Sequence, residues 1–283
     1  MTMGADESWS AADAARHIAV PRPNDDKYSR GVLGVITGSV QYPGAAVLGV
    51  EAALRAGVGM VRYLGSQRAQ DLILQRRPEA VMSAGRVQAW LIGSGMDYAD
   101  REDAAETLIT NALSQAVPIV LDGGAIDVAT RATGPVVVTP HFRELARLLD
   151  EPVESIAADP ERWAREAALR LGVTVLLKGH ITYVTDGATT VSVSAAPPWL
   201  ATAGAGDALG GILGSLVATH SDEVLADPRL LVGLAATASF IHGAAAQRAS
   251  AGGPLTILDL CAHVPAAIAD ILQSDGPVAN PVW

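Results

Sequence analysis

The sequence has little of what several classes of protein require. Cys261 is the single cysteine among 283 residues, so no intramolecular disulfide can form and a cytoplasmic location is favoured. We interpret Cys261 as a buried structural thiol. Aromatic residues make up only 4% of the chain, so small and aliphatic side chains must fill the core. Lys and Arg total 20 against 30 Asp and Glu, a net charge of −10, which argues against a nucleic-acid binder with a basic face.

Long apolar runs and targeting segments are also missing. No stretch reaches the ~18 uninterrupted apolar residues of a membrane span, and the first residues lack the basic and apolar regions of a signal peptide. The apolar run from Leu231 to Ala246 contains Thr237, Ser239 and His242, so we interpret it as a buried helix with His242 as a core or helix-end histidine. These features predict a soluble cytoplasmic protein with no nucleic-acid or membrane partner.

Short apolar runs alternate with Ala- and Leu-rich helical stretches from Gly31 onward. This alternation predicts one α/β domain with a largely parallel central sheet flanked by helices on both faces. We expect the domain to span 30–283, preceded by a polar segment or linker over 1–29 that includes a short helix at Ser10–His17. The expected strands are Gly31–Thr37, Met60–Leu64, Ala80–Met82, Ala89–Ile92, Pro118–Asp122, Val136–Thr139, Thr174–Lys178, Ile181–Thr185 and Thr190–Val193, the last two joined as a hairpin by Asp186-Gly187. The expected helices are Ala45–Ala56, Asp103–Ala116, Arg143–Leu149, Pro160–Leu171, Gly206–His220, Pro228–Arg248 and Leu258–Ser274.

Glycines and polar residues follow four of these strands. In an open α/β sheet, ligands bind at the carboxyl ends of the strands, so we expect these four clusters to line one rim. They are Thr37-Gly38-Ser39, Gly93-Ser94-Gly95, Asp122-Gly123-Gly124 and Thr139-Pro140-His141.

The segment from Leu200 to Gly214 carries the most specific pattern. Small residues at 204–206 leave the backbone uncovered just before an amphipathic helix, an arrangement in which N–H groups and the helix dipole attract an anion. Asp207 falls in the first turn, where its carboxylate can act as a general base toward a hydroxyl or simply cap the helix. The Gly-x-x-x-x-Gly-Lys-Ser/Thr motif of P-loop kinases is absent from the sequence.

Here the sequence resembles a known family. Ala201-Thr-Ala-Gly-Ala-Gly-Asp207 is similar to the signature of the ribokinase-like superfamily. Three further segments resemble the ADP/ATP-dependent NAD(P)H-hydrate dehydratases within it: Gly38-Ser39 with Tyr42-Pro-Gly-Ala-Ala46 and Ala52–Gly59, Val138-Thr-Pro-His-Phe-Arg-Glu144, and Leu177-Lys-Gly-His-Ile-Thr182. The resemblance spans roughly Lys27 to Arg248.

The resemblance implies a repair enzyme for hydrated NADH or NADPH. A nucleotide, ADP or ATP, would phosphorylate the hydroxyl on the nicotinamide ring, and loss of phosphate would restore the double bond. Asp207 would deprotonate that hydroxyl as the catalytic base, and Glu144 would organise Mg²⁺ and its water shell. The implied contacts to the hydrated dinucleotide are Ala45, Gly95, His141 and Asp207, and those to the nucleotide are Lys178, Gly179, His180, Ile181, Thr182, Gly204, Ala205 and Gly206.

Several of these residues also have a purely structural interpretation. Glu144 can be a first-turn carboxylate favoured by the helix dipole, His141 a helix cap, and Lys178 a lysine at the end of a strand. The glycines of Gly93-Ser94-Gly95 can serve a tight turn.

The chain departs from the family pattern at three places. Gly93-Ser94-Gly95 replaces Gly-Pro-Gly, Asp122-Gly-Gly-Ala125 replaces Asp-Ala-Asp-Gly, and Thr202–Asp207 replaces Thr-Gly-Gly-Thr-Gly-Asp. Two other functions therefore stay open: a small-alcohol kinase of the hydroxyethylthiazole or hydroxymethylpyrimidine type, and a non-catalytic nucleotide-binding protein. The apolar composition and the resemblance together predict a homo-oligomer, a tetramer by family resemblance, and any partner epimerase would be a separate protein.

Overall fold

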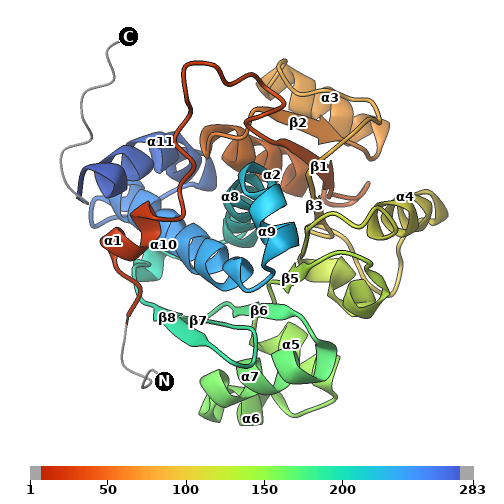
Figure 1. Cartoon of the computed structure of the whole chain (residues 1–283). Coiled ribbons are helices and arrows are strands. Elements are labelled where there is room, and N and C mark those ends of the chain that lie inside the picture. Colours follow the sequence, from red (N-terminus) through yellow and green to blue (C-terminus); the bar gives the residue numbers. More distant parts are fainter. Residues whose placement is uncertain (1–7, 275–283) are drawn as a thin grey trace.

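The predicted sheet is present in the computed structural model, which describes residues 8–274 (Figure 1). Its eight strands lie in the order β2-β1-β3-β4-β5-β6-β7-β8. Pairing is parallel from β2 to β6 and antiparallel from β6 to β8, so the expected hairpin is confirmed. The strands are β1 Val32–Ile36, β2 Met60–Tyr63, β3 Ala89–Ile92, β4 Ile119–Leu121, β5 Val136–Val138, β6 Thr174–Leu177, β7 Thr182–Thr185 and β8 Thr190–Val193.

Helices cover both faces of this sheet (Figure 1). One layer contains α2 Pro43–Arg55, α3 Gln67–Arg76, α8 Ala205–Thr219, α9 Ser221–Ala226, α10 Leu230–Ser250 and α11 Ile257–Ser274, with the short α1 Ala11–Ala15 against it. The other contains α4 Asp103–Leu113, the 3₁₀ helix η1 Gly123–Arg131, α5 Phe142–Leu149, α6 Val153–Ala158 and α7 Pro160–Leu171. A second 3₁₀ turn, η2 Pro198–Leu200, precedes α8.

The strand sequences divide their side chains between two cores. Leu33 and Val35 of β1 join the core under α2, α8 and α10, whereas Val32 and Ile36 join the core under α4 and η1. This alternation is the period-two geometry of a strand, and because both faces are covered, β1, β3, β4 and β5 contain no charged or hydroxyl-bearing residue. The continuous apolar character of these short runs is therefore explained by burial on both sides.

Among residues 8–274, two helices, α10 and α11, are long and apolar enough to cross a membrane by length and composition alone. In α10, 78% of the most apolar 18-residue window is buried inside the protein, so packing against the sheet accounts for its composition. In α11 the corresponding fraction is 33%, and its buried side faces α10, α2 and α1. The apolar run containing His242 is thus a buried helix, as predicted.

Part of the segment before residue 29 contacts the α/β domain, through Trp9. The Trp9 backbone N–H donates to the Ser192 carbonyl at 2.8 Å, and its indole N–H donates to Thr237 of α10 at 3.2 Å. Ser10 caps α1 through a capping box with Asp13. The division into residues 1–29 and 30–283 stays a prediction.

The expected strand Ala80–Met82 is wrong. Only Val81 pairs, through a single bridge to Arg62 at the outer side of β2, because the chain leaves the sheet edge after one residue. The helices α3, α6 and α9 and the 3₁₀ helices η1 and η2 were not expected. Within α3 only Ala69 and Ile73 are buried, so its apolar stripe is too narrow to produce a clear helical period.

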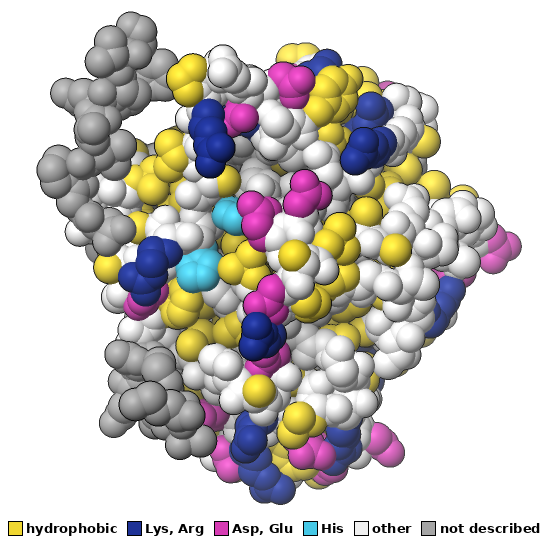
Figure 2. All heavy atoms as spheres, viewed as in Figure 1, with side chains coloured by type: hydrophobic (Ala, Val, Ile, Leu, Met, Phe, Trp, Pro, Cys, Tyr) yellow, Lys and Arg dark blue, Asp and Glu magenta, His cyan; other side chains and the backbone are white. Residues whose placement is uncertain are grey.

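The visible surface mixes charges of both signs. In Figure 2, basic side chains lie scattered among acidic ones over the face shown in Figure 1.

Cys261 is fully buried, and burial raises the pKa of its thiol to about 12. A thiol in that state is a weak nucleophile, which confirms its structural interpretation.

Candidate active site

The carboxyl ends of neighbouring parallel strands meet at one rim and are joined by hydrogen bonds. After β1, the Gly38 N–H donates to the Ser94 carbonyl after β3 at 2.7 Å. The Ser94 hydroxyl donates to Asp122 after β4 at 2.9 Å. The Thr139 hydroxyl after β5 donates to the same carboxylate at 2.7 Å. All four predicted clusters therefore lie along one edge of the sheet.

Asp122 is the centre of this network, a role that the sequence analysis did not assign. Besides the two hydroxyls, it accepts a hydrogen bond from the Lys178 ammonium at 2.7 Å and is 4% exposed. Burial alone would raise its pKa, but the Lys178 charge and the three hydrogen bonds hold the pKa below its usual value. A signal was available: an acidic residue directly after a fully apolar strand at the expected rim.

Asp207 lies in the first turn of α8, as predicted. The N-cap of this helix is Gly204, whose φ of 90° is left-handed, and a Cβ there would come within 2.5 Å of Leu48, so glycine is required on both counts. Among residues 8–274, no side-chain hydrogen bond caps the start of α8, so the Asp207 carboxylate is available to other partners. Burial, and next the negative charge of Asp122, raise its pKa to about 7, while Lys178 opposes the rise.

Lys178 follows β6 and lies among three carboxylates. Its ammonium is 2.7 Å from Asp122 and 3.7 Å from Glu144, and Asp207 also acts on its charge. It lies 3.5 Å from the position that a Cβ on Gly206 would occupy, beside the N-terminus of α8. Although burial lowers the pKa of Lys178, the charges of Asp122 and Glu144 raise it above its usual value, so the cation persists at the rim.

His141 and Glu144 form a reciprocal cap at the start of α5. The Glu144 N–H donates to His141 Nδ1 at 3.1 Å, and the His141 N–H donates to Glu144 Oε2 at 2.7 Å. His141 therefore caps the helix and Glu144 lies in its first turn, as the purely structural interpretation of each residue predicted. The cap still leaves Glu144 Oε2 within reach of Lys178 and leaves half of the His141 side chain exposed, so it does not exclude a second role.

Ala45 and Gly95 lie in direct contact. A Cβ on Gly95 would come within 2.4 Å of the Ala45 Cβ, and Gly95 has a left-handed φ of 70°, so only glycine lets the β3 loop approach α2 this closely. The Asp207 carbonyl of α8 faces Gly49 of the same helix α2. A further cavity of about 140 Å³ adjoins these loops, lined by Gly38, Ser39, Met96 and residues of the loop before α4.

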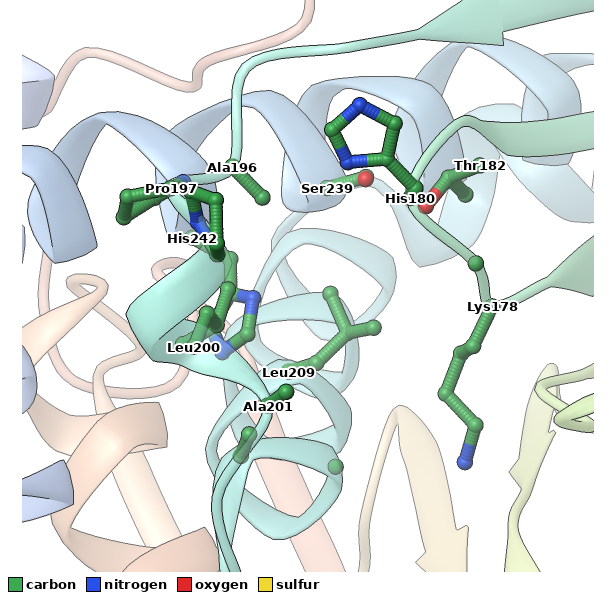
Figure 3. Close-up of a pocket in the computed structure, with 14 residues that line it drawn as sticks. Lys178, His180, Thr182, Ala196, Pro197, Leu200, Ala201, Leu209, Ser239 and His242 are labelled. Carbon is green, nitrogen blue, oxygen red and sulfur yellow. The ribbon is translucent and has the colours of Figure 1, made fainter.

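A larger cavity of about 480 Å³ opens beside the α8 N-terminus (Figure 3). Six residues that the sequence assigned to the nucleotide line it: Lys178, Gly179, His180, Thr182, Ala205 and Gly206. Two others do not: Gly204 packs against Leu48 and Ile257, and the Ile181 side chain is 40% exposed. The other eight lining residues were not assigned from the sequence: Ala196, Pro197, Pro198, Leu200, Ala201, Leu209, Ser239 and His242.

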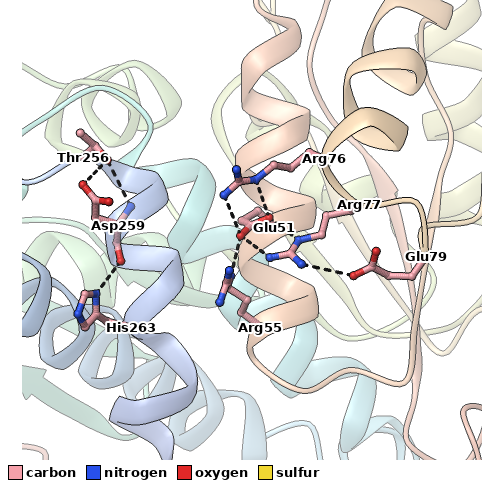
Figure 4. A network of polar contacts seen from close by, with 8 residues as sticks. All are labelled: Glu51, Arg55, Arg76, Arg77, Glu79, Thr256, Asp259 and His263. Atoms are coloured by element: carbon pink, nitrogen blue, oxygen red, sulfur yellow. Dashed lines mark hydrogen bonds and ion pairs between the residues drawn. The ribbon is translucent and has the colours of Figure 1, made fainter.

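The helix that carries Ala45 is held in place by a buried ion cluster (Figure 4). Glu51 of α2 is 0% exposed and is contacted by Arg55 at 2.6 Å, by Arg76 of α3 at 3.2 Å and by Arg77. Burial would raise its pKa, but hydrogen bonds from Arg77, Arg55 and Arg76 lower it to about 2. The cluster ties α3 to α2 and so stabilises one side of the rim.

The carboxylates at this rim can hold a cation such as Mg²⁺ only if a bound ligand supplies further oxygen atoms. Residues 8–274 contain no cluster of three or more His, Cys, Asp or Glu side chains able to hold a metal ion. Mg²⁺ in nucleotide enzymes needs only one or two carboxylates, because phosphates and waters complete its shell. Glu144, 3.7 Å from the Lys178 ammonium, offers one such carboxylate.

The sheet order, the antiparallel hairpin at its edge and the aspartate that follows Gly206 at a helix N-terminus together give the chain a ribokinase-like α/β fold. A family model described as NAD(P)H-hydrate dehydratase matches residues 33–262. The chain therefore belongs to the NAD(P)H-hydrate dehydratase family.

Individual relatives agree with this assignment. The chain is 40% identical over 224 residues to the "Bifunctional NAD(P)H-hydrate repair enzyme Nnr" of Mycobacterium tuberculosis, covering 75% of this chain and 46% of that protein. It thus spans about half the length of this curated relative. It is 33% identical over 242 residues to the "ADP-dependent (S)-NAD(P)H-hydrate dehydratase" of Xanthomonas campestris, covering 76% and 82% of the two chains.

A solved structure supports the fold. The ADP/ATP-dependent NAD(P)H-hydrate dehydratase of Bacillus subtilis, co-crystallised with ATP/Mg²⁺, superposes with a TM-score of 0.81 at 24% identity, covering 93% of this chain and 98% of that chain.

Proposed function

We propose that the protein dehydrates the S-form of hydrated NADH or NADPH, using ADP or ATP and giving AMP or ADP and phosphate. The observation that carries the proposal is the position of Asp207. Its carboxyl has a pKa raised to about 7; it directly follows Gly206 of the cavity wall, and its backbone carbonyl faces Gly49 of α2, the helix that carries Ala45. The family assignment and the names of the relatives support the same reaction.

In this proposal Asp207 acts as general base. It takes the proton of the ring hydroxyl while that oxygen attacks the terminal phosphorus of the nucleotide, and the bridging P–O bond breaks. The phosphate ester then leaves as phosphate, and loss of a ring proton restores the double bond. A base with a pKa near 7 combines a useful deprotonated fraction with strong basicity at neutral pH.

The nucleotide fits the larger cavity. Its 480 Å³ lies within the range of small-molecule sites, and Lys178 at one end provides a cation beside the N–H groups of α8. Gly179, His180, Ile181 and Thr182 would form the adjoining wall, with Gly204, Ala205 and Gly206 at the phosphate end. Asp122 keeps the Lys178 ammonium aimed at that end through the 2.7 Å hydrogen bond.

Glu144 would hold Mg²⁺ through water. Bound there, the cation would neutralise phosphate charge. The hydrogen bond that Glu144 accepts from the His141 backbone fixes the orientation of the carboxylate. Its partner His141, half exposed at the same edge, would contact the hydrated dinucleotide together with Ala45 and Gly95.

The direct test is recovery of the near-ultraviolet absorbance of reduced nicotinamide. Purified protein is incubated with hydrated NADH or NADPH, Mg²⁺ and either ADP or ATP. Recovery that requires the nucleotide supports the proposal. Nucleotide consumption with a small alcohol such as hydroxyethylthiazole, without any recovery, would favour the kinase alternative. Binding of nucleotide with no turnover of either substrate would favour a non-catalytic protein.

The proposal also includes the location of the protein, its oligomeric state and a partner enzyme. A cytoplasmic location follows from the single buried cysteine. The expected homo-oligomer, a tetramer by resemblance, is tested by light scattering of the purified protein. The relative from Mycobacterium tuberculosis is named bifunctional, and an epimerase acting as a separate partner of this chain is tested by adding the R-form of the hydrate with and without such an enzyme.

A further inference from the structure

One wall of the large cavity is formed by two polar residues of α10 that have no assigned role. Ser239 and His242 are three residues apart and therefore project from the same face of the helix. Both line the cavity opposite Lys178 (Figure 3). They are 9% and 6% exposed, so they belong to the interior of the protein, and both line this cavity.

His242 is unusual because it is buried without a full set of partners. Its Nε2 has no hydrogen-bond partner among the described residues, whereas buried polar atoms are usually hydrogen-bonded. Burial lowers the pKa of His242 to about 4, against a hydrogen bond with the Ala205 backbone that raises it, so the ring is neutral at physiological pH and its Nε2 remains open to a ligand. An unpaired buried polar atom costs free energy, and this cost is removed if a ligand supplies the partner.

The surroundings indicate which part of a ligand reaches His242. The walls beside it are apolar: Ala196, Pro197, Pro198, Leu200 and Leu209. Figure 3 shows His242 close to Pro197 and Leu200, on the far side of the cavity from the Lys178 ammonium. A flat ring fits between such walls, and a few polar groups in an apolar pocket fix its orientation. The charged end of the same ligand would lie at Lys178.

We propose that His242, assisted by Ser239, recognises the purine ring of the nucleotide and determines base specificity. This inference rests on the proposed use of a nucleotide and adds the residues that recognise its base. The neutral imidazole pairs with an edge of the ring, and the Ser239 hydroxyl, one helical turn away, lies beside it. The phosphates are held elsewhere, by Lys178 and the α8 backbone.

The test separates the two ends of the ligand. Dissociation constants of the full chain are measured by calorimetry, in the presence of Mg²⁺, for ADP and for inorganic pyrophosphate, which lacks the base. His242→Leu should weaken ADP binding about tenfold, as expected for one lost hydrogen bond, and leave pyrophosphate binding unchanged. His242→Gln, which keeps a neutral donor and acceptor, should restore most of the ADP affinity, and Ser239→Ala should weaken it by a few fold.

Two controls make the result decisive. His263→Leu, on α11 and outside the cavity lining, should change neither constant. Pyrophosphate binding and thermal melting report whether each variant keeps its fold. Equal losses of ADP and pyrophosphate in His242→Leu, or unchanged ADP affinity in a folded variant, would overturn the inference. Failure of the unaltered protein to bind ADP would instead refute the proposed function itself, so the two failures are distinguishable.

Discussion

Replacing Asp207 by Asn should have opposite effects on activity and on stability. The carboxylate is proposed as the general base, so its loss should lower kcat by roughly 10²–10⁴-fold. The same carboxylate is held in an unfavourable place, because burial and the charge of Asp122 raise its pKa to about 7. Asn has nearly the same shape and no charge, so it should remove that unfavourable term and stabilise the fold.

The size and pH dependence of this stabilisation follow from the pKa. A rise from 3.8 to about 7 corresponds to about 4 kcal/mol between the two protonation states. Below pH 3.8 Asp207 is protonated in both the folded and the unfolded protein, so no destabilisation exists. As the pH rises, the unfolded chain loses its proton first, and the free energy of unfolding falls until the folded protein also loses its proton near pH 7. Asp207→Asn should therefore gain about 2 kcal/mol at pH 5 and at most about 4 kcal/mol at pH 8.

Urea denaturation at these two pH values measures the effect. The difference between the variant and the unaltered protein is taken at each pH, so that other titrating groups cancel. Asp103, an exposed first-turn aspartate of α4, provides the matched control, and Asp103→Asn should show no comparable gain. A stabilisation that is the same at pH 5 and pH 8 would contradict the raised pKa. An active Asp207→Asn variant would contradict the role as base.

Three further outcomes are expected at the rim and in the ion cluster. Asp122→Asn removes the charge that helps raise the pKa of Asp207, so the acidic limb of kcat/KM against pH should move to lower pH, whereas Ser94→Ala, which leaves that charge in place, should move it less. Glu144→Gln retains an oxygen for the cap at His141 but loses the charge, so the Mg²⁺ concentration for half-maximal rate should rise several fold, while Glu161→Gln in the first turn of α7 should not change it. Glu51→Gln leaves Arg55, Arg76 and Arg77 without their buried partner and should lower the free energy of unfolding by about 3 kcal/mol in urea titrations, with little change in KM.

The sequence predicted the parallel sheet and its rim because both are recorded in local patterns. Apolar runs such as Ile119–Leu121 are buried on both faces, and the glycines and hydroxyls after them lie at strand ends. The prediction of a strand at Ala80–Met82 was wrong, because a strand forms only where a neighbouring strand pairs with it as well as where its own residues favour it. Val81 finds only one bridge at the margin of the sheet, a fact that no local pattern contains.

The parts of the site that the sequence missed depend on contacts between distant residues. Asp122 and Lys178 are 56 positions apart, and nothing near either residue announces the other. His242 was interpreted correctly as buried, but its missing partner becomes visible only when the walls from η2 and α8 are placed against α10. The role of Asp122 at the centre of the hydrogen-bond network therefore depends on pairing between distant parts of the chain, which the sequence near Asp122 does not record.

Lys178 links the two halves of the proposed chemistry, and the distances around it explain why. Its ammonium contacts Asp122 at 2.7 Å and Glu144 at 3.7 Å, lies beside Gly206 and lowers the pKa of Asp207. Replacing it by Met would remove a phosphate contact and at the same time leave three carboxylates without a nearby cation. The pKa of Asp207 should then rise further, so its base form would be scarce at neutral pH. A Lys178→Met variant should therefore lose nucleotide affinity and also regain part of its turnover at alkaline pH, a combination that a lysine serving only as a phosphate ligand would not produce.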